Sequence, residues 1–265
     1  MSQVTDISTS AAGSQTVHRA FELLRLVACG QEGGVRLKDL VEITGLNKPT
    51  VHRLLRTLIQ ESAIEQDHTT RRYRIGRDLS LLGIARNRRF PLQVAAESYL
   101  SDLAERVGDT VFLSVRDRLD SVCIMRCTGN EPIQVLSIEV GVRRPLGRGV
   151  SGVILLACLS KKEANTLIEQ NKTRLIKLGD RTEDIMQQVE NARELGYAFR
   201  PSGLMPMTSA ISVPLMSEQG SVLGAITITA MQSRLPSARL PEVIAHMQER
   251  ARRIVSRHQD IVQRG

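Results

Sequence analysis

The stretch "GLNKPTVHRLLRTL", residues 45–58, decides how the first third of the chain folds. Its apolar residues recur at helical spacing, whereas Thr50, His52 and Arg53 lie on the opposite side. Asn47 is a good N-cap residue, because its side-chain oxygen can accept a free backbone N–H of the first turn. The stretch therefore predicts a short amphipathic helix. Its polar side faces either water alone or a binding partner.

A second short helix is predicted immediately before this one. In "VRLKDLVEITG", residues 35–45, Leu37, Leu40 and Val41 form an apolar stripe, and Gly45 ends the helix. Two short helices joined by a tight turn that contains glycine are typical of a helix-turn-helix. The polar residues of the second helix suit a DNA major groove, where arginine bonds guanine and hydroxyl or imidazole groups bond base edges or backbone. An ordinary surface helix that meets only water is the alternative.

A basic hairpin follows the second helix. The segment "AIEQDHTTRRYRIG", residues 63–76, alternates on either side of a polar turn at 67–70. A helix-turn-helix followed by a basic hairpin is typical of a winged helix, whose wing reaches the DNA backbone or minor groove. Arg72 and Arg74 share one face of the return strand, so we expect these two to contact phosphates. The predicted DNA-binding residues are Lys48, Thr50, His52, Arg53, Arg56, Arg71, Arg72 and Arg74.

Positive charge is concentrated in the same part of the chain. The 265 residues carry a formal net charge of +8. Residues 15–90 hold 14 Lys or Arg against 8 Asp or Glu. A solvated basic surface is one interpretation. A surface that faces phosphates is favoured, because the excess falls on the predicted helix-turn-helix and hairpin.

Four segments are predicted along the chain. Residues 1–14 are rich in small and hydroxyl side chains and are predicted to be a disordered leader. Residues 15–76 form the winged helix-turn-helix, and residues 77–90 a linker helix that Pro91 ends. Residues 91–265 form a second domain. No run of about 18 apolar residues predicts a membrane span, and no secretory signal is recognised, so we expect a cytoplasmic protein.

The second domain is predicted to be α+β within the broad α/β class. Helical periodicity up to residue 107 gives way to period two in "TVFLSVRD", "SVCIMRCTG" and "PIQVLSIEV", which predict three strands. Helices follow, then three more strands, then a long final helix. Strands that follow one another through hairpins predict an antiparallel sheet with flanking helices. The core must be aliphatic, since aromatic residues make up only 3% of the chain.

A candidate ligand site lies in "RRPLGRGVSGVILLA", residues 143–157. Glycines precede a helix that begins near Val150, and free N–H groups at a helix start attract a carboxylate or phosphate. We expect Arg148 to neutralise the charge. A tight turn into a buried helix is the alternative. Small and hydroxyl residues on opposing strands complete the predicted effector-binding set: Leu146, Arg148, Gly149, Val150, Ser151, Ala210, Ser212, Thr227 and Thr229.

Catalytic chemistry is not predicted. "GRGVSGV" is close to a nucleophile elbow, but Val153 stands where that pattern needs glycine. The five histidines fall in the winged-helix part and the final helix, away from any expected triad. The four cysteines form no C-x-x-C pair, so no metal site is predicted. We expect no catalytic residue, metal or cofactor, with a small-molecule hydrolase as the remote alternative.

"LNKPTVHRLLRTL", "RRYRIGRDLSLLG" and "GDTVFLSVRDRLDSVCIMR" resemble the IclR family of bacterial transcriptional regulators, from about Thr16 to His258. The resemblance implies a GAF-like effector-binding domain, a homodimer or dimer of dimers, and two partners: double-stranded operator DNA and a small organic acid. It also implies control of a catabolic operon. Lys38 and Arg71 depart from the usual cap and wing-turn residues. "GRGVSGVI" departs from the usual "HATA-x-GKA", so a sensor or interaction protein without bound effector is the alternative function.

Overall fold

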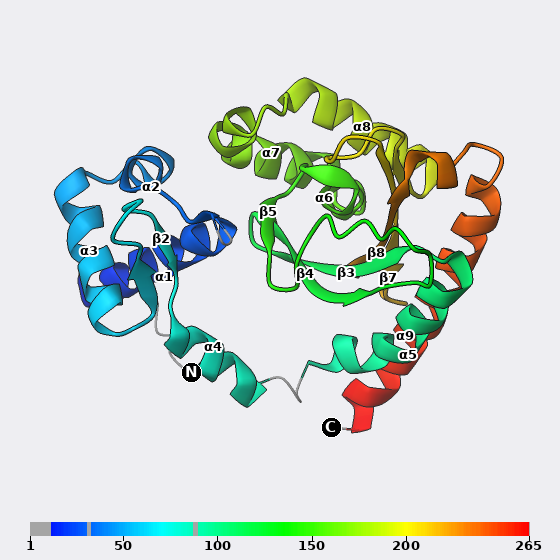
Figure 1. The fold of residues 1–265 in the computed structure, drawn as a ribbon, viewed down its shortest axis with the longest axis horizontal. Coiled ribbons are helices and arrows are strands. Elements are labelled where there is room, and N and C mark those ends of the chain that lie inside the picture. Colours follow the sequence, from blue (N-terminus) through cyan, green and yellow to red (C-terminus); the bar gives the residue numbers. More distant parts are fainter. Residues whose placement is uncertain (1–11, 31–32, 87–89, 265) are drawn as a thin grey trace, which may run out of the picture. The chain divides into compact units, whose positions relative to one another are not determined.

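The computed structural model describes residues 12–30, 33–86 and 90–264 (Figure 1). Contacts within the chain divide it into two compact units, residues 1–87 and 88–265. Each unit has a hydrophobic core of its own. No helix among the described residues is both long enough and apolar enough to cross a membrane.

The first unit is a helix-turn-helix with a two-stranded wing. The β-strands pair antiparallel, with Glu65 opposite Arg74, and Val35 adds an isolated bridge to Tyr73. Buried side chains from all three helices and the wing form one aliphatic core, including Leu40 and Leu55. The elements are α1 (Ala12–Cys29), α2 (Leu37–Thr44), α3 (Lys48–Gln60), β1 (Ile64–Gln66) and β2 (Tyr73–Ile75).

Helix α1 buries only part of the apolar stripe that helical spacing gives residues 17–28. Leu24 and Val27 are buried, but Val17 and Phe21 are 57% and 52% exposed. Leu23 and Leu26 are buried as well. Phe21 finds a partner at the surface, since the Arg25 guanidinium lies 5.8 Å from its ring centroid. A helix with apolar residues on more than one face leaves the choice of inward face to tertiary packing.

Two predicted segments border on residues that the structure does not describe. The predicted leader, residues 1–14, lies outside the described residues up to residue 11, and α1 already begins at Ala12. The predicted linker helix appears as α4 (Arg77–Arg86), and residues 87–89 lie outside the described part. Leu82 and Ile84 of α4 are 68% and 67% exposed.

The second unit is built on a six-stranded antiparallel sheet in the order β5-β4-β3-β8-β7-β6 (Figure 1). Helices flank both of its faces, which confirms the predicted α+β architecture. The elements are α5 (Pro91–Val107), β3 (Thr110–Asp117), β4 (Asp120–Cys127), β5 (Arg143–Pro145), α6 (Gly149–Ala157), α7 (Lys161–Lys177), α8 (Thr182–Leu195), β6 (Ala198–Arg200), β7 (Thr208–Met216), β8 (Val222–Met231) and α9 (Leu240–Arg264).

The side chains of β8 alternate between the two faces of this sheet. Ile226 and Ile228 are fully buried in the cluster that joins α5 and α9 to the sheet. Because successive side chains of a strand point to opposite faces, Thr227 and Thr229 face the side that carries α6. Both threonines line a cavity there. The alternation of β8 therefore provides an apolar core on one face and hydroxyl groups on the other.

One predicted strand is absent from the described residues. Residues 132–140, "PIQVLSIEV", form an irregular loop, and the third strand along the chain is the short β5. Ile133, Leu136 and Val140 are 64%, 47% and 54% exposed, whereas Val135 and Ile138 are buried, so burial in this segment does not follow the period-two alternation of a strand. The same loop places Ser137 and Ile138 on the wall of the cavity.

Candidate nucleic-acid interface and candidate ligand cavity

Helix α3 presents a polar side that takes no part in the core. The Asn47 side chain accepts a hydrogen bond from the Thr50 backbone N–H at 2.9 Å, which confirms the predicted N-cap. The apolar stripe of α3 is buried, from Val51 to Leu58. His52, Arg53 and Arg56 are exposed, and Thr50 is half-buried at the edge. Arg53 and Arg56 form no ion pair with a described residue, so their charges remain free for a partner.

The wing turn is organised by one carboxylate. Asp67 accepts hydrogen bonds from the backbone N–H groups of Thr69 and Thr70 at 3.0 and 2.7 Å. The Thr70 hydrogen bonds hold the pKa of Asp67 below its ordinary value. Arg71 closes the turn with a left-handed backbone, φ 57°. This backbone conformation favours glycine, so placing an arginine there costs about 1 kcal/mol of conformational free energy.

The three wing arginines differ in what they contact. Arg72 donates to the carbonyl oxygens of Gly33 and Gly34 at 3.3 and 2.9 Å. Arg74 pairs with Asp67 at 3.3 Å. Both guanidinium groups already have partners within the first unit, and their predicted phosphate contacts stay predictions. The guanidinium of Arg71 is exposed and has no hydrogen-bond or ion-pair partner among the described residues.

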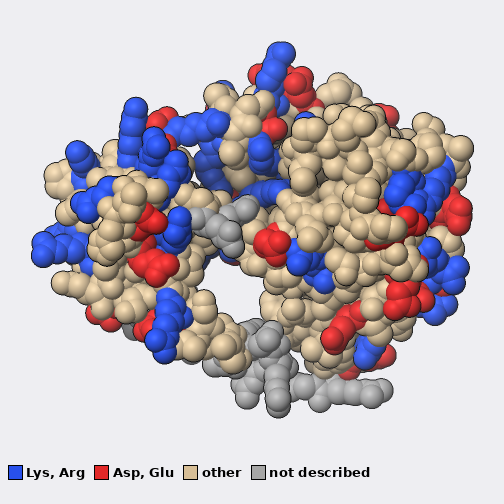
Figure 2. All heavy atoms as spheres, in the orientation of Figure 1, with Lys and Arg blue, Asp and Glu red and all other residues tan. Residues whose placement is uncertain are grey.

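A basic groove lies between the wing turn and the start of α2. Sequence reasoning had included Lys48 and Arg71 but missed Arg36 and Lys38, which line the same groove. Helix α2 begins without a side-chain cap, as the presence of Lys38 had predicted. None of these four cations has an acidic partner in the described part of the chain. Lys and Arg side chains also gather on the visible face of this unit (Figure 2).

The second unit encloses a small cavity between α6, the sheet and the loop 132–140. Its volume is about 40 Å³, room for roughly three water molecules at ~10–15 Å³ each. Six of the nine predicted effector-binding residues line it: Gly149, Val150, Ser151, Ala210, Thr227 and Thr229. The first three come from the start of α6 and the last three from β7 and β8. The structure thus brings together segments that lie far apart in the sequence.

Three predicted residues do not line the cavity. Arg148 pairs with Asp180 at 2.5 Å and donates to the Leu178 carbonyl at 2.9 Å, so its charge is already neutralised elsewhere. Ser212 donates to the Ile226 carbonyl between neighbouring strands. Leu146 is fully buried in the core below α6.

Other expectations for the cavity also need correction. Gly147 makes room for Ile185, because a Cβ at residue 147 would come within 2.8 Å of that side chain. The aliphatic residues Met125 and Leu136, at strand-like positions of the sequence, do not line the cavity, and Leu136 is 47% exposed. Phe112 and Leu204 supply apolar wall instead.

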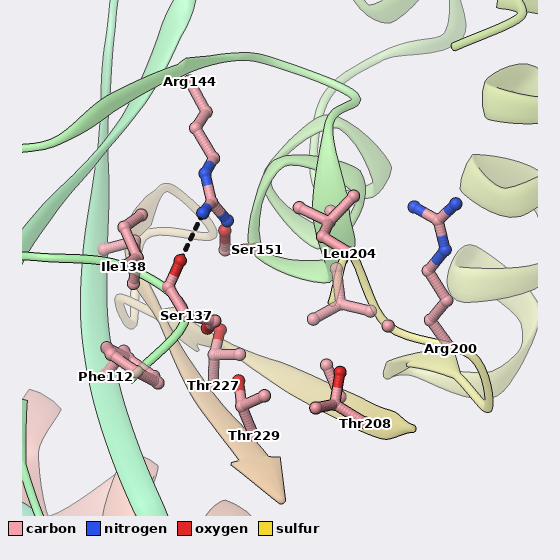
Figure 3. Close-up of a pocket in the computed structure, with 15 residues that line it drawn as sticks. Phe112, Ser137, Ile138, Arg144, Ser151, Arg200, Leu204, Thr208, Thr227 and Thr229 are labelled. Carbon is pink, nitrogen blue, oxygen red and sulfur yellow. Dashed lines mark hydrogen bonds between the residues drawn. The ribbon is translucent and has the colours of Figure 1, made fainter. Parts of the chain in front are cut away.

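The floor of the cavity is rich in hydroxyl groups (Figure 3). Thr208 donates to the Met205 carbonyl at 2.7 Å, and Thr227 is hydrogen-bonded to Ser212 at 2.9 Å. Thr229 is only 5% exposed, yet its hydroxyl has no hydrogen-bond partner among the described residues. Buried hydroxyl groups normally have a partner, so Thr229 indicates a place for a polar ligand atom or water.

Arg144 enters the cavity from β5, a residue that sequence reasoning missed. Its Nη2 donates to the Ser137 carbonyl at 2.5 Å (Figure 3). Burial lowers the pKa of Arg144, and the charge of Arg148 lowers it further. Strand alternation was the available signal: the neighbouring Arg143 pairs with Asp117 and Asp120 on one face, so Arg144 must face the other.

Comparisons with known proteins agree with both units. The family model "Bacterial transcriptional regulator IclR C-terminal" matches residues 86–256, and "IclR helix-turn-helix domain" matches residues 16–68. The regulator XynR of Escherichia coli K12 is 27% identical over 237 residues, covering 89% of this chain and 93% of that protein. The glycerol operon regulatory protein of Streptomyces coelicolor is 28% identical over 246 residues, covering 92% and 96%.

Solved structures share the fold. An IclR family transcriptional regulator from Brucella abortus superposes with a TM-score of 0.74 at 21% identity, covering 97% of this chain and 96% of that one. A second regulator, from Alicyclobacillus acidocaldarius, gives a TM-score of 0.67 at 22% identity, covering 92% and 98%.

Proposed function

The chain belongs to the IclR family of bacterial transcriptional regulators, and from this premise we propose that a small organic acid in the cavity controls its affinity for operator DNA. The protein is a DNA-binding regulator and not an enzyme. The observation that carries the proposal is the buried cavity itself, which joins the start of α6 to the hydroxyl groups of β8. An apolar pocket with a few convergent polar groups is typical of a small-molecule site.

The DNA side of the proposal assigns α3 to the major groove. Arg53 and Arg56 are exposed cations that suit contacts to bases or phosphates, with Thr50 and His52 on the same helix. Lys48 and Arg71 approach the adjacent backbone from the basic groove. Helix-turn-helix proteins commonly bind as dimers whose two recognition helices meet half-sites one helical turn apart. We therefore assign a homodimer, or a dimer of dimers, to the operator complex.

The effector side follows from the α6 start. Gly149, Val150 and Ser151 open the helix without a side-chain cap, so their N–H groups face the cavity with the positive end of the helix dipole. A carboxylate satisfies these donors. The ligand changes operator affinity only if it binds two conformations of the protein unequally. The name of the glycerol operon relative supports the assignment of a catabolic operon to this chain as well.

The test measures operator affinity with and without candidate acids. Fluorescence anisotropy of a labelled DNA fragment from upstream of the protein's own gene gives the Kd in each case. A screen of carboxylic acids with two to six carbons should contain at least one that shifts the Kd about fivefold or more, the lower range of typical coupling between sites. A Kd that no acid in the screen changes would favour the alternative, a sensor or interaction protein without bound effector.

A further inference from the structure

Arg144 is unlike the other enclosed arginines of the second unit. Arg143 pairs with Asp120, and Arg174 pairs with the same carboxylate at 2.7 Å. Arg148 pairs with Asp180. The Arg144 guanidinium has no carboxylate partner among the described residues, although it projects into the cavity. A largely enclosed guanidinium keeps its positive charge at neutral pH, so the cavity contains a cation without a counter-ion.

The hydrogen bonding of Arg144 is incomplete. Within the described chain, the one partner of its side chain is the Ser137 carbonyl, and a guanidinium offers five N–H donors. Ser137 belongs to the loop 132–140, which also contributes Ile138 to the wall. A neutral carbonyl is a weaker acceptor than a carboxylate, which can accept two parallel N–H groups from one guanidinium. An anion that takes Nη2 in such a bidentate pair would compete with the Ser137 carbonyl, which is one of the contacts that hold the loop.

A second polar position lies on the floor of the cavity. Thr229 comes from β8, whereas Arg144 comes from β5, so a ligand that touches both spans the cavity. Thr229 as a residue is 5% exposed, and its hydroxyl lacks a hydrogen-bond partner in the described part of the chain. Ser114 of β3, which is 3% exposed, lies on the same wall. These hydroxyl groups suit a ligand hydroxyl rather than a second charge.

We propose that Arg144 is the anion receptor of this cavity and that its ligand is a short hydroxycarboxylate, whose carboxylate displaces the Ser137 carbonyl from the guanidinium. The proposal rests on the proposed function, since it assumes that the cavity is the effector site. The volume of about 40 Å³ restricts the ligand to a few non-hydrogen atoms. The ligand hydroxyl bonds Thr229. Loss of the Ser137 contact releases the loop 132–140, so ligand binding in the cavity changes the conformation of this loop.

Arg200 is the rival cation of the cavity wall. It extends from β6, and in Figure 3 the side chain of Leu204 stands between its guanidinium and Arg144. Arg200 is half-exposed, whereas the threonines on the floor of the cavity are buried. Its position suits the entrance of the cavity, whereas Arg144 lies against the loop and the start of α6. Separate substitution of the two arginines distinguishes their roles.

The binding test uses glycolate and acetate as probes, with the neutral amides glycolamide and acetamide as charge controls. Isothermal titration on the full chain should show that glycolate binds at least tenfold more tightly than glycolamide. Arg144→Gln should weaken glycolate binding at least tenfold, and Arg144→Lys should recover part of the loss. Arg116→Gln removes an exposed arginine from β3 of the same unit and should leave the Kd within twofold. Circular dichroism confirms that each variant is folded.

Two further variants test the geometry. Thr229→Val keeps the shape of the side chain but removes its hydroxyl, so glycolate should lose its advantage over acetate. Arg200→Gln should change the Kd for glycolate less than Arg144→Gln does. The proposal is overturned if the Kd of Arg144→Gln for glycolate lies within twofold of the parent's. It is also overturned if none of the probes binds.

Hydrogen exchange tests the displacement of Ser137. Amides of the loop 132–140 should exchange at least threefold faster in ligand-free Arg144→Gln than in the parent. Saturating glycolate should produce the same change in the parent and none in Arg144→Gln. If the amides of the loop 132–140 exchange at equal rates in both proteins, with and without glycolate, Ser137 is not displaced.

The outcomes for Arg144 and for the proposed function are separable. If glycolate binding depends on Arg144 but glycolate does not change operator affinity, Arg144 is an anion receptor and the proposed function is contradicted. A change in operator affinity that persists in Arg144→Gln sustains the proposed function and contradicts the receptor.

Discussion

The two units use arginine in opposite ways. In the second unit the two most buried arginines are paired: Arg250 with Asp102 at 2.6 Å and Arg174 with Asp120 at 2.7 Å. In the first unit Arg53 and Arg71 are exposed and have no acidic partner among the described residues. Paired cations stabilise a fold, whereas unpaired cations on a folded surface mark the place where an external anion binds. Arg144 lies in the second unit but, like Arg53 and Arg71 of the first, it has no acidic partner among the described residues.

Breaking a pair in the second unit should have the largest effect. Asp109 is 2% exposed and contacts Arg234 at 2.7 Å and Arg239 at 3.5 Å. Asp109→Ala leaves both guanidinium groups without this carboxylate and should lower the free energy of unfolding of the second unit by about 3 kcal/mol. Urea denaturation followed by circular dichroism measures the change. Glu218→Ala, in the exposed turn after β7, is the control. A loss no larger than that of the control would show that the pairing does not stabilise the fold.

Removing an unpaired cation from α3 should affect affinity rather than stability. Arg53→Ala should weaken operator binding by about 1–3 kcal/mol if the side chain makes a bidentate base contact, and it should relax specificity at one base pair. Anisotropy titrations against the operator and against single-base variants measure both effects. Arg252→Ala removes an exposed arginine from α9 and should have little effect on the same titrations. Parent-like operator binding by a folded Arg53→Ala protein would remove this residue from the interface.

The smallest effect distinguishes the arginines within the wing. Arg71→Ala should reduce the slope of log K against log salt by about 1, because one phosphate contact is lost. Arg72→Ala should leave that slope unchanged, since its guanidinium is bonded to the Gly33 and Gly34 carbonyl groups. Titrations at four salt concentrations measure the slopes. Equal slopes for the two variants would mean that intramolecular contacts do not predict which wing arginine binds DNA.

Local patterns predicted the first unit well. The N-cap at Asn47 and the buried stripe of α3 follow from spacing and side-chain chemistry within a few residues. The hairpin follows from alternation about a polar turn, and β1 and β2 pair as expected. The inward face of α1 did not follow, since Leu23 and Val17 are equally apolar and only packing chooses between them.

The cavity depended on partners that lie far away in the sequence. Ser151 and Thr229 were predicted from a helix start and from strand alternation, and both line it. Arg148 was predicted because it adjoins the helix start, but Asp180 engages it. That carboxylate is 32 residues away. Likewise, the alternation of residues 132–140 predicted a strand, but the segment pairs with no described strand, and the residues it buries, Val135 and Ile138, are three apart instead of two.

The left-handed backbone at Arg71 sets stability against binding at one residue. Glycine would fit φ 57° without strain, so Arg71→Gly should make the wing turn more stable. If Arg71 contacts DNA as proposed, the same substitution should weaken operator binding. A single change at the wing turn would then move stability and affinity in opposite directions.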